Sequence, residues 1–308
     1  MSSNEILCIG EVLWDALPEG LFLGGAPFNV ACHLRGAGLP AAVVSRVGDD
    51  RLGAEARRRA ARYGVTVDLM QVDESLPTGF VDVSVDSSGD AAYEIVTPAA
   101  WDAIAATDEL LARARDARAI VFGSLAQRHP TSRRTIERLL ESKATKTFDV
   151  NLRPPYDDIE VVRHSLRQSD IVKLSASEMA QAAEWFGLRG SLRQQVEALA
   201  ETFGCGVVCV TRGRDGACLW HDGSWTEHAG FQVEVRDTVG AGDAFLAVLL
   251  AGLLSGTADA ALLHHANLIG AYVATQYGAV PADQSAAIAP PAPAPPAAAP
   301  RRRRAKRA

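Results

Sequence analysis

One short segment combines an acidic side chain with a backbone suited to binding phosphate. The segment 237–243, Asp-Thr-Val-Gly-Ala-Gly-Asp, stands directly before an apolar stretch that reaches Leu254. Glycines on both sides of an alanine let successive backbone N–H groups converge on an anion at the positive end of a helix. Asp243 falls in the first helical turn, where a carboxylate beside a phosphate could accept the proton of an attacking hydroxyl. An acidic residue in a first turn is also common for stability alone, so the segment by itself leaves both interpretations open.

A second pair of segments could bind hydroxyl groups. Residues 10–15, Gly-Glu-Val-Leu-Trp-Asp, follow the first apolar run, and residues 24–29, Gly-Gly-Ala-Pro-Phe-Asn, open the first long helical pattern. Polar groups after a parallel strand lie at the carboxyl edge of the sheet, where small ligands bind in such folds. Asp15 and Asn29 can bind hydroxyls, and the paired glycines let a ligand approach the backbone. The alternative is an ordinary loop followed by a helix start.

The elements that position these segments are predicted from apolar periodicity. Continuously apolar runs predict strands buried on both faces, at Ile6–Ile9, Ala42–Val47, Ala119–Phe122, Thr147–Val150, Ile171–Leu174 and Val207–Thr211. Helical patterns lie between them, at Phe28–Leu34, Leu52–Tyr63, Ser132–Ser142, Glu160–Arg167, Ser177–Trp185 and Leu192–Phe203. This alternation predicts an α/β fold with a central, mostly parallel sheet flanked by helices.

A region of different periodicity predicts a small lid. Gly79–Val85 alternates apolar and polar residues with period two, and a turn at Asp86–Asp90 leads to a second run, Ala92–Val96. This pattern is typical of a β-hairpin with one solvated face. We expect a small β lid built from about residues 11–22 and 78–97, which would close over the ligand. Its exposed apolar residues could also pair two subunits as a homodimer.

Composition and charge exclude several classes of protein. The chain has 308 residues, of which 48% are hydrophobic and 22% charged. Its net charge is −6, and without the six basic residues among the last eight it would be −12. Such an acidic body argues against a nucleic-acid-binding fold. The longest apolar run, Ala244–Leu254, is shorter than the roughly 18 residues that span a bilayer. We therefore expect a cytoplasmic protein with no membrane partner, in which Cys205 and Cys209 are small core residues.

The end of the chain differs in character from the rest. Residues 286–300 are almost entirely Ala and Pro, and an Arg-rich stretch follows them. We expect one domain over residues 1–285 and a disordered tail over residues 286–308. Contact of the Arg-rich stretch with nucleic acid or anionic lipid is the functional alternative. A solvated tail is favoured, because no aromatic residues lie among the charges.

Together the glycine-containing segments resemble a known family. In type and order they match the two signatures of the ribokinase-like (PfkB) carbohydrate kinases, and the resemblance covers roughly residues 5–280. Residues 10–15, 77–79 and 149–154 are most similar to the bacterial fructokinase branch. The resemblance implies a ribokinase-like fold, ATP and Mg²⁺ as cofactors with K⁺ as a further candidate, and phosphorylation of a sugar hydroxyl. Fructose giving fructose 6-phosphate is the first choice, and 2-keto-3-deoxygluconate, ribose or a nucleoside are alternative acceptors. A sugar-binding regulator without catalysis is the rival from another class.

The resemblance also implies roles for individual residues. Asp243 corresponds to the general base, and the backbone of Gly240, Ala241 and Gly242 to the anion hole around the transferred phosphoryl group. The implied sugar contacts are Asp15, Gly24, Gly25, Asn29, Asn151 and Arg153. The implied nucleotide contacts are Lys173, Glu178, Thr211, Gly213, Gly216 and Asn267. Glu178 would hold magnesium through water, and the backbone of Asp237 and Thr238 matches part of a monovalent-cation site.

The chain departs from the family pattern in two places, and two rival motifs are excluded. Ser175 stands where the family often carries Asn in an Asn-x-x-Glu motif, and Gln276 stands where a basic residue is often found. No P-loop sequence occurs. Residues 36–41 fit a dinucleotide-binding pattern, but they follow a predicted helix and precede a predicted strand, the reverse of the required order. We interpret them as the end of a helix.

Overall fold

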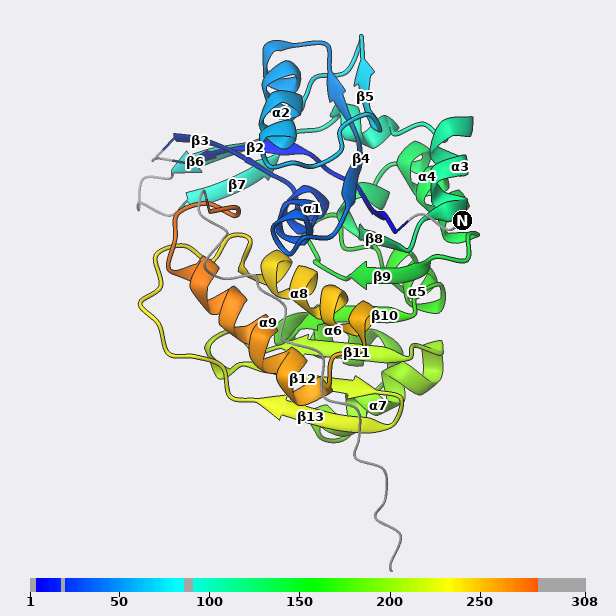
Figure 1. Ribbon diagram of the computed structural model, residues 1–308, viewed down its shortest axis with the longest axis vertical. Helices are drawn as coiled ribbons and strands as arrows, with labels where there is room; N and C mark the ends of the chain where they lie inside the picture. The colour runs from blue at the N-terminus through cyan, green and yellow to red at the C-terminus, as the bar shows by residue number, and fades with distance from the viewer. Residues whose placement is uncertain (1–3, 18–19, 86–90, 282–308) are drawn as a thin grey trace, which may run out of the picture.

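The computed structural model describes residues 4–17, 20–85 and 91–281 (Figure 1). The predicted turn at residues 86–90 and the predicted tail at residues 286–308 lie outside the described residues. Within them, a nine-stranded sheet has the order β13-β12-β11-β10-β9-β8-β1-β4-β5. Its strands are β1 (Ile6–Ile9), β4 (Ala41–Gly48), β5 (Met70–Asp73), β8 (Ala119–Gly123), β9 (Thr145–Asp149), β10 (Ile171–Ser175), β11 (Val207–Thr211), β12 (Ala217–His221) and β13 (Ser224–His228). The strands from β11 to β5 pair in parallel, and β12 and β13 are antiparallel additions at one edge.

Helices cover both faces of this sheet. They are α1 (Ala26–Gly36), α2 (Arg51–Arg62), α3 (Asp108–Asp116), α4 (Pro130–Leu140), α5 (Ile159–Arg167), α6 (Ala176–Phe186), α7 (Leu192–Phe203), α8 (Ala241–Ser255) and α9 (Asp259–Ala274). Short 3₁₀ turns lie at Ala100–Ala103, Leu125–Gln127 and Gly213–Asp215. Among the described residues, α3 to α7 contribute to one core cluster, and α1, α2, α8 and α9 contribute to the other.

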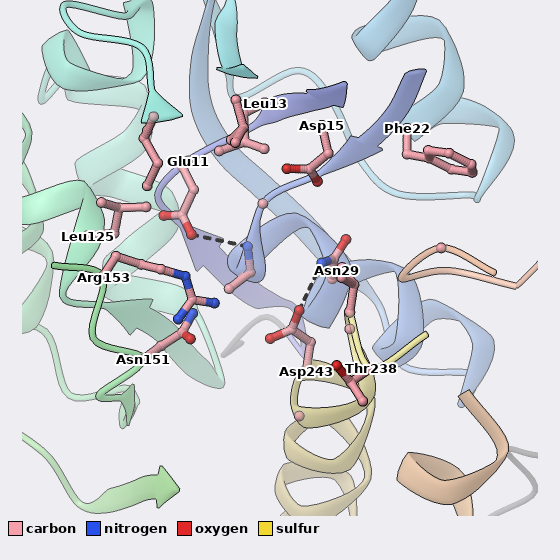
Figure 2. A pocket seen from close by; sticks show the side chains of 18 of the residues that line it. Glu11, Leu13, Asp15, Phe22, Asn29, Leu125, Asn151, Arg153, Thr238 and Asp243 are labelled. Carbon is pink, nitrogen blue, oxygen red and sulfur yellow. Dashed lines mark hydrogen bonds between the residues drawn. The ribbon is translucent and has the colours of Figure 1, made fainter. Parts of the chain in front are cut away.

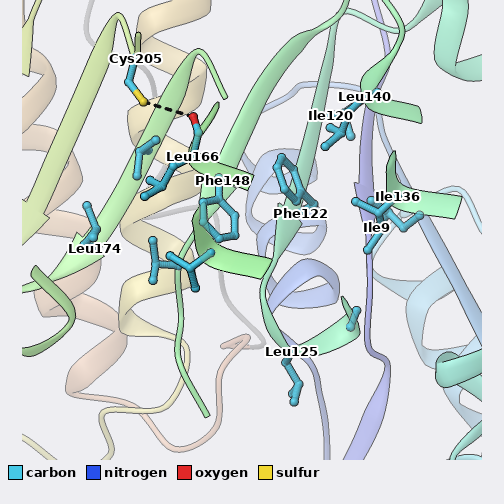
Figure 3. Close-up of a cluster of buried hydrophobic side chains, with 14 of the residues drawn as sticks. Ile9, Ile120, Phe122, Leu125, Ile136, Leu140, Phe148, Leu166, Leu174 and Cys205 are labelled. Carbon is cyan, nitrogen blue, oxygen red and sulfur yellow. Dashed lines mark hydrogen bonds between the residues drawn. The ribbon is translucent and has the colours of Figure 1, made fainter. Parts of the chain in front are cut away.

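The alternation of side chains along each strand produces these two cores. Leu7 and Ile9 of β1 belong to the first cluster, whereas Ile6 and Cys8 belong to the second. In the first cluster the rings of Phe122 and Phe148 stack on neighbouring strands, with their centroids 5.0 Å apart (Figure 3). All four β1 side chains are completely buried. Burial on both faces explains why the strands read as continuous apolar runs.

A second, smaller sheet stands beside the end of the first. Its order is β3-β2-β6-β7, formed by β2 (Leu13–Leu17), β3 (Gly20–Gly24), β6 (Gly79–Val85) and β7 (Ala91–Ile95). The pairs β2–β3 and β6–β7 are antiparallel, and β2 and β6 pair in parallel. The strands of the predicted hairpin are thereby confirmed. The short connection from β1 to β2 carries the chain from one sheet directly into the other.

The predicted α/β architecture is confirmed, with differences at particular elements. Each of the six predicted strands corresponds to a strand of the large sheet, and α1 ends at Gly36, as its interpretation as a helix end requires. Helix α4 begins at Pro130 rather than Ser132, because proline suits the first helical position and His129 caps the helix. The hairpin β12–β13 was not predicted, and β2 and β3 fall largely within the predicted lid segment of about residues 11–22, for which no individual strands were given. No helix in the described ranges is long and apolar enough to cross a membrane.

Candidate active site

The first turn of α8 begins at a glycine that no other residue could replace without displacing its neighbours. Gly240 caps the helix with φ +78°, and a Cβ there would overlap the backbone of Ala279. The chain must make this left-handed turn for α8 to start at Ala241. The N–H of Ala241 donates to the carbonyl oxygen of Thr238 at 3.3 Å. The next N–H groups of a first helical turn have no partner within the helix, so they are available to an anion. The glycine-flanked segment therefore forms the helix start that its sequence predicts.

Asp243 is held in place by a residue from the other end of the chain. The amide Nδ2 of Asn29 in α1 donates to Oδ2 of Asp243 at 2.8 Å, and both side chains are buried (Figure 2). Because a carboxylate only accepts, the amide group of Asn29 must face Asp243, and its Oδ1 points elsewhere. That Oδ1 has no partner among the described residues. The two predicted motifs thus meet in space at a direct hydrogen bond.

The larger cavity of the structure opens around this pair. Its volume is about 970 Å³, and it lies between the small sheet and the edge of the large one (Figure 2). The predicted sugar contacts that line it are Asp15, Gly25, Asn29, Asn151 and Arg153. Gly24 instead lies against the Asp15 carboxylate, outside the lining of the cavity. The backbone of Asn151 has φ +39°, a left-handed conformation that asparagine tolerates better than most residues.

Two carboxyl groups in the wall of this cavity have unusual pKa values. Burial raises the pKa of Glu11 to about 7, although the Arg153 guanidinium opposes the shift. Burial also raises the pKa of Asp15 to about 6, and Arg153 again acts in the opposite direction. Arg153 itself is exposed, and its guanidinium extends into the cavity near Glu11 (Figure 2). Glu11, Asp15 and Arg153 make this part of the cavity wall strongly polar.

A buried ion pair lies beneath the first turn of α8. Nζ of Lys173 in β10 lies 2.8 Å and 3.0 Å from the two carboxylate oxygens of Asp149 at the end of β9. Burial alone would lower the pKa of Lys173, but Asp149 raises it above its ordinary value, so the ammonium stays charged. A Cβ on Gly242 would lie 3.2 Å from Nζ. Lys173, predicted as a nucleotide contact, lines the larger cavity beside the α8 turn.

Glu178 is fixed by backbone groups at the start of α6. Its Oε2 accepts from the N–H of Ser175 at 2.7 Å, and its Oε1 accepts from the N–H of Leu152 at 2.8 Å. Ser175 caps α6 in return, since its Oγ accepts from the N–H of Glu178 at 3.3 Å. The serine that replaces the family's asparagine therefore serves as a helix cap. Glu178 is held rigidly at the edge of the sheet.

A second cavity, of about 630 Å³, lies on the other side of the α8 turn. The predicted nucleotide contacts Thr211, Gly213, Gly216 and Asn267 all line it. A Cβ at Gly216, whose φ is +79°, would overlap the backbone of His228 and Gly230, so only glycine fits there. Thr238 and Gly242 line both cavities, Ala241 lines the second, and Asp243 lines the first. The first turn of α8 is therefore the wall that the two cavities share.

Asp237 supports the loops around this shared wall. Its Oδ1 accepts from the N–H of Val239 at 2.9 Å, and its Oδ2 accepts from the N–H of Gly278 at 3.1 Å. The Nε2 of His33 lies 2.9 Å from the carbonyl oxygen of Ala279, next to Gly240. With its carboxylate engaged in this way, Asp237 would contribute its backbone rather than its side chain to a cation site, as the resemblance implies.

Several residues of the larger cavity were not predicted as site residues. They are Glu11, Phe22, Glu94, Tyr156, Arg236 and Tyr277. Glu11 had a usable signal, because it lies two residues after the end of the first strand, at the ligand-binding edge of the sheet. The others lie in loops or in the small sheet, where no local pattern distinguishes a cavity residue from a surface residue.

Comparisons with known proteins agree with this geometry. The family model for pfkB family carbohydrate kinases matches residues 19–286. A fructokinase of Escherichia coli is 30% identical over 269 residues, covering 82% of this chain and 85% of the relative. The aminoimidazole riboside kinase of Salmonella typhimurium is 30% identical over 302 residues, covering 91% and 92%. The crystal structure of an uncharacterized sugar kinase from Pyrococcus horikoshii in complex with ATP has a TM-score of 0.75 at 27% identity, covering 89% and 94%. The predicted family is thus confirmed, and the chain belongs to the pfkB family of carbohydrate kinases.

Proposed function

We propose that the protein transfers the γ-phosphoryl group of ATP to the primary hydroxyl of a neutral sugar, with fructose giving fructose 6-phosphate as the first choice. One observation carries the proposal. The first turn of α8 separates two cavities, with the Asp243 carboxylate on the larger side and Ala241 on the other. An acceptor in the larger cavity and a nucleotide in the second would meet at this turn.

Asp243 is suited to act as the general base. The hydrogen bond from Asn29 leaves Oδ1 of Asp243 free to accept the proton of the sugar hydroxyl. The hydroxyl oxygen forms a bond to the γ-phosphorus, the bond from phosphorus to the bridging oxygen of ADP breaks, and the hydroxyl proton passes to Asp243. Because Asn29 is buried and fixed in α1, the carboxylate keeps one orientation throughout. Such positioning is a main demand of phosphoryl transfer.

The charge of the transferred group is matched by fixed donors. The N–H groups of Gly242 and Asp243 and the positive end of the α8 dipole would form the anion hole, next to Ala241, whose N–H donates to the carbonyl oxygen of Thr238 at 3.3 Å. Lys173 adds a charged ammonium next to Gly242. All of these groups are in place before the reaction, so little reorganisation is needed when charge develops on the phosphoryl oxygens.

The residues around Lys173 fit a magnesium ion bound together with a nucleotide. Asp149, Glu178 and Asp243 all act electrostatically on Lys173, so three carboxylates surround one ammonium. This excess of negative charge suits a divalent cation. In the part of the chain that the structure describes, no cluster of three metal-ligating side chains forms a closed cage. Magnesium in kinases needs only one or two carboxylates, with water and phosphates completing the shell, and we propose Glu178 as the residue that holds it through water. When bound, the ion neutralises phosphate charge.

The charge of the larger cavity favours an uncharged acceptor. Its lining includes five carboxylates and three basic side chains. The carboxylates are Glu11, Asp15, Glu94, Asp237 and Asp243, and the basic residues are Arg153, Lys173 and Arg236. A sugar acid such as 2-keto-3-deoxygluconate would add a further negative charge to this surplus. Neutral hydroxyl groups would find acceptors in Asp15 and in the unpartnered Oδ1 of Asn29.

A riboside is the second candidate acceptor. The larger cavity is lined by the aromatic rings of Phe22, Tyr156 and Tyr277, which could contact a base. The similarity to an aminoimidazole riboside kinase supports the same class. A ring attached to the sugar would extend toward these aromatic side chains at the outer part of the cavity.

An acceptor panel tests the proposal directly. Purified protein is given ATP and Mg²⁺ with fructose, ribose, 2-keto-3-deoxygluconate, aminoimidazole riboside or adenosine, and release of ADP is measured. We expect fructose to have the highest kcat/KM. If only a riboside is phosphorylated, the second candidate acceptor replaces fructose. If the protein binds sugar but shows no Mg²⁺-dependent turnover, it is a regulator.

Two further features belong to the same proposal. We propose that the small sheet closes over the acceptor and excludes water, since Leu13, Asp15, Phe22 and Val81 of this sheet line the larger cavity. We also propose a K⁺ site at the backbone of residues 237–238, which replacement of K⁺ by Na⁺ in the assay would test. Pairing of two subunits through the small sheet is tested by light scattering of the purified protein.

A further inference from the structure

Glu11 lies in the connection between β1 and β2, where the two sheets meet. Its side chain is buried, 3% of its surface being exposed, and it lines the larger cavity. Oε1 accepts from the N–H of Ala26 at 3.1 Å and so binds the first turn of α1. Oε2 has no partner among the described residues. A buried carboxylate oxygen without a hydrogen-bond partner costs free energy. At a ligand cavity, this cost indicates that Oε2 of Glu11 gains a partner when the ligand is bound.

The nearest cationic group at this end of the cavity is also incompletely bound. Nη1 of Arg153 donates to the carbonyl of Leu152 at 2.9 Å, and its remaining donors have no partner in the described ranges. The guanidinium lies near the Glu11 carboxylate (Figure 2) and lowers the pKa of both Glu11 and Asp15. Within the described part of the chain, no ion pair joins Arg153 to either carboxylate. Each group therefore has free capacity for the other.

We propose that Glu11 is a positioning residue for Arg153: when an acceptor enters the larger cavity, the Arg153 guanidinium moves onto Oε2 of Glu11 and is held there against the sugar. The inference rests on the proposed function of this cavity. In water the attraction between the two groups is weak, but a sugar that displaces water strengthens it. The guanidinium presents five N–H donors in a rigid fork, so one edge can bind Glu11 while another faces a sugar hydroxyl.

The surrounding charges define the pH dependence of this ion pair. The charged groups that act on Glu11 are Arg153, from the loop after β9, and Asp243, from α8. Asp15 of β2 shares the influence of Arg153. Because the pKa of Glu11 is about 7 in the free protein, the ion pair requires Glu11 to lose its proton over this range. Acceptor affinity of the wild type therefore increases as pH rises from 6 to 8.

A double-mutant cycle on the full chain tests the inference. The variants are Glu11→Gln, Arg153→Gln and the double variant, and Glu201→Gln is the control, since Glu201 is an exposed carboxylate of α7 that lines neither cavity. Glutamine keeps an oxygen for the N–H of Ala26, so α1 retains its contact. The measurements are the dissociation constant of fructose by calorimetry without ATP, at pH 6 and 8, and the KM values for fructose and ATP.

The inference predicts a particular pattern of coupling. Each single variant at position 11 or 153 raises the fructose dissociation constant at least tenfold at pH 8, and the double variant adds no more than threefold to the larger effect. The KM for ATP changes less than threefold, and Glu11→Gln loses the increase of affinity between pH 6 and 8. Multiplicative effects in the double variant, or an unchanged dissociation constant in Glu11→Gln, would overturn the inference. A wild type that phosphorylates no acceptor in the panel would instead overturn the proposed function, before any variant is compared.

Discussion

The two cavities on either side of the α8 turn have opposite chemical characters. The larger one is lined by five carboxylates, two of which have pKa values raised by burial. Among the described residues, the second one has no carboxylate in its lining, and its polar groups are alcohols, amides, glycine backbone and the two arginines Arg212 and Arg214. The difference indicates that the acceptor side selects its ligand by placed charges and hydrogen bonds. The nucleotide side selects its ligand by shape and by backbone groups that come close to it, as expected of a site for a polyanion.

The largest expected effect is the loss of the base on the acceptor side. Asp243→Asn should lower kcat by about 10²- to 10⁴-fold, because the amide cannot accept the hydroxyl proton. The affinity for ATP should change little, since Asp243 does not line the second cavity. Steady-state kinetics and calorimetry with ATP measure the two effects separately.

The control for this variant is Asp108→Asn. Asp108 is also an acidic residue in a first helical turn, that of α3, and it lies outside both cavities. Both variants lose the favourable interaction with the helix dipole, worth about 0.3–1 kcal/mol. If the two variants retained similar turnover, the role of Asp243 would be structural only.

The next effect concerns a variant that should weaken nucleotide binding and leave acceptor binding unchanged. Gly216→Ala puts a Cβ against the backbone of His228 and Gly230 in the wall of the second cavity. We expect the KM for ATP to rise about tenfold, equivalent to roughly 1.4 kcal/mol, while the KM for the acceptor stays within twofold. The measurement is KM for each substrate at saturating concentrations of the other.

Gly223→Ala is the matched control for the backbone strain. Gly223 has a similar positive φ of +88°, but a Cβ there would meet no atom within 4 Å. It should lose stability because of its positive φ and keep both KM values. Equal changes of the ATP KM in the two variants would mean that the close contact at Gly216 is irrelevant to nucleotide binding.

A third effect concerns the folding stability that is lost because Glu11 is buried in the wall of the larger cavity. The pKa of Glu11 is raised from 4.5 to about 7, so between these values the folded protein binds more protons than the unfolded chain. Stability from this group therefore falls as pH rises through the window, by about 3 kcal/mol in total. Glu11→Gln should remove this decrease, and urea unfolding at pH 5 and pH 8 measures it.

The comparison between variant and wild type isolates Glu11 from other groups. Burial also raises the pKa of Asp15 and of Asp149 to about 6, so the wild-type profile contains their contributions, which the variant shares. We expect Glu11→Gln to gain stability relative to the wild type from pH 5 to pH 8. Parallel profiles for the two proteins would contradict the raised pKa.

The smallest effect is expected from the end of the chain. Truncation after Gln284 should leave kcat/KM for the acceptor within twofold, because both cavities are lined by residues between Glu11 and Gly278. Retention on a nucleic-acid column before and after truncation tests the electrostatic alternative for the Arg-rich stretch. A large loss of turnover would show that the tail contributes to one of the two cavities.

Much of the fold could be predicted because its central strands are buried on both faces. Runs such as Ile6–Ile9 and Val207–Thr211 have no polar interruption, and their burial in the structure is nearly complete. Residues 11–22 were expected in the lid, but the individual strands β2 and β3 were not predicted, since β2 pairs with β6, more than sixty residues away, and the local sequence does not indicate such a partner. The hairpin β12–β13 was missed because its polar edge strand resembles a loop.

The candidate site could be predicted where a glycine that the backbone conformation requires stands close to polar residues in the sequence. The segments around Gly25 and Gly240 show this, and the structure brings their neighbours Asn29 and Asp243 into direct contact. The position of Glu11 just after the first strand was a usable signal for the cavity, but its proposed role depends on burial and on an unpartnered oxygen, which are tertiary properties. Gly24 shows the converse, since its motif suggests a ligand contact while its backbone lies against Asp15.

The central claim is that two different ligands meet at the first turn of α8, one in each cavity. A crystal structure of Asp243→Asn with fructose and a non-hydrolysable ATP analogue tests it most directly. We predict fructose in the larger cavity, with its primary hydroxyl within hydrogen-bond distance of residue 243, and the analogue in the second cavity, with its γ-phosphate at the N–H groups of residues 242 and 243. A nucleotide seated in the larger cavity, or a sugar bound away from residue 243, would contradict the account.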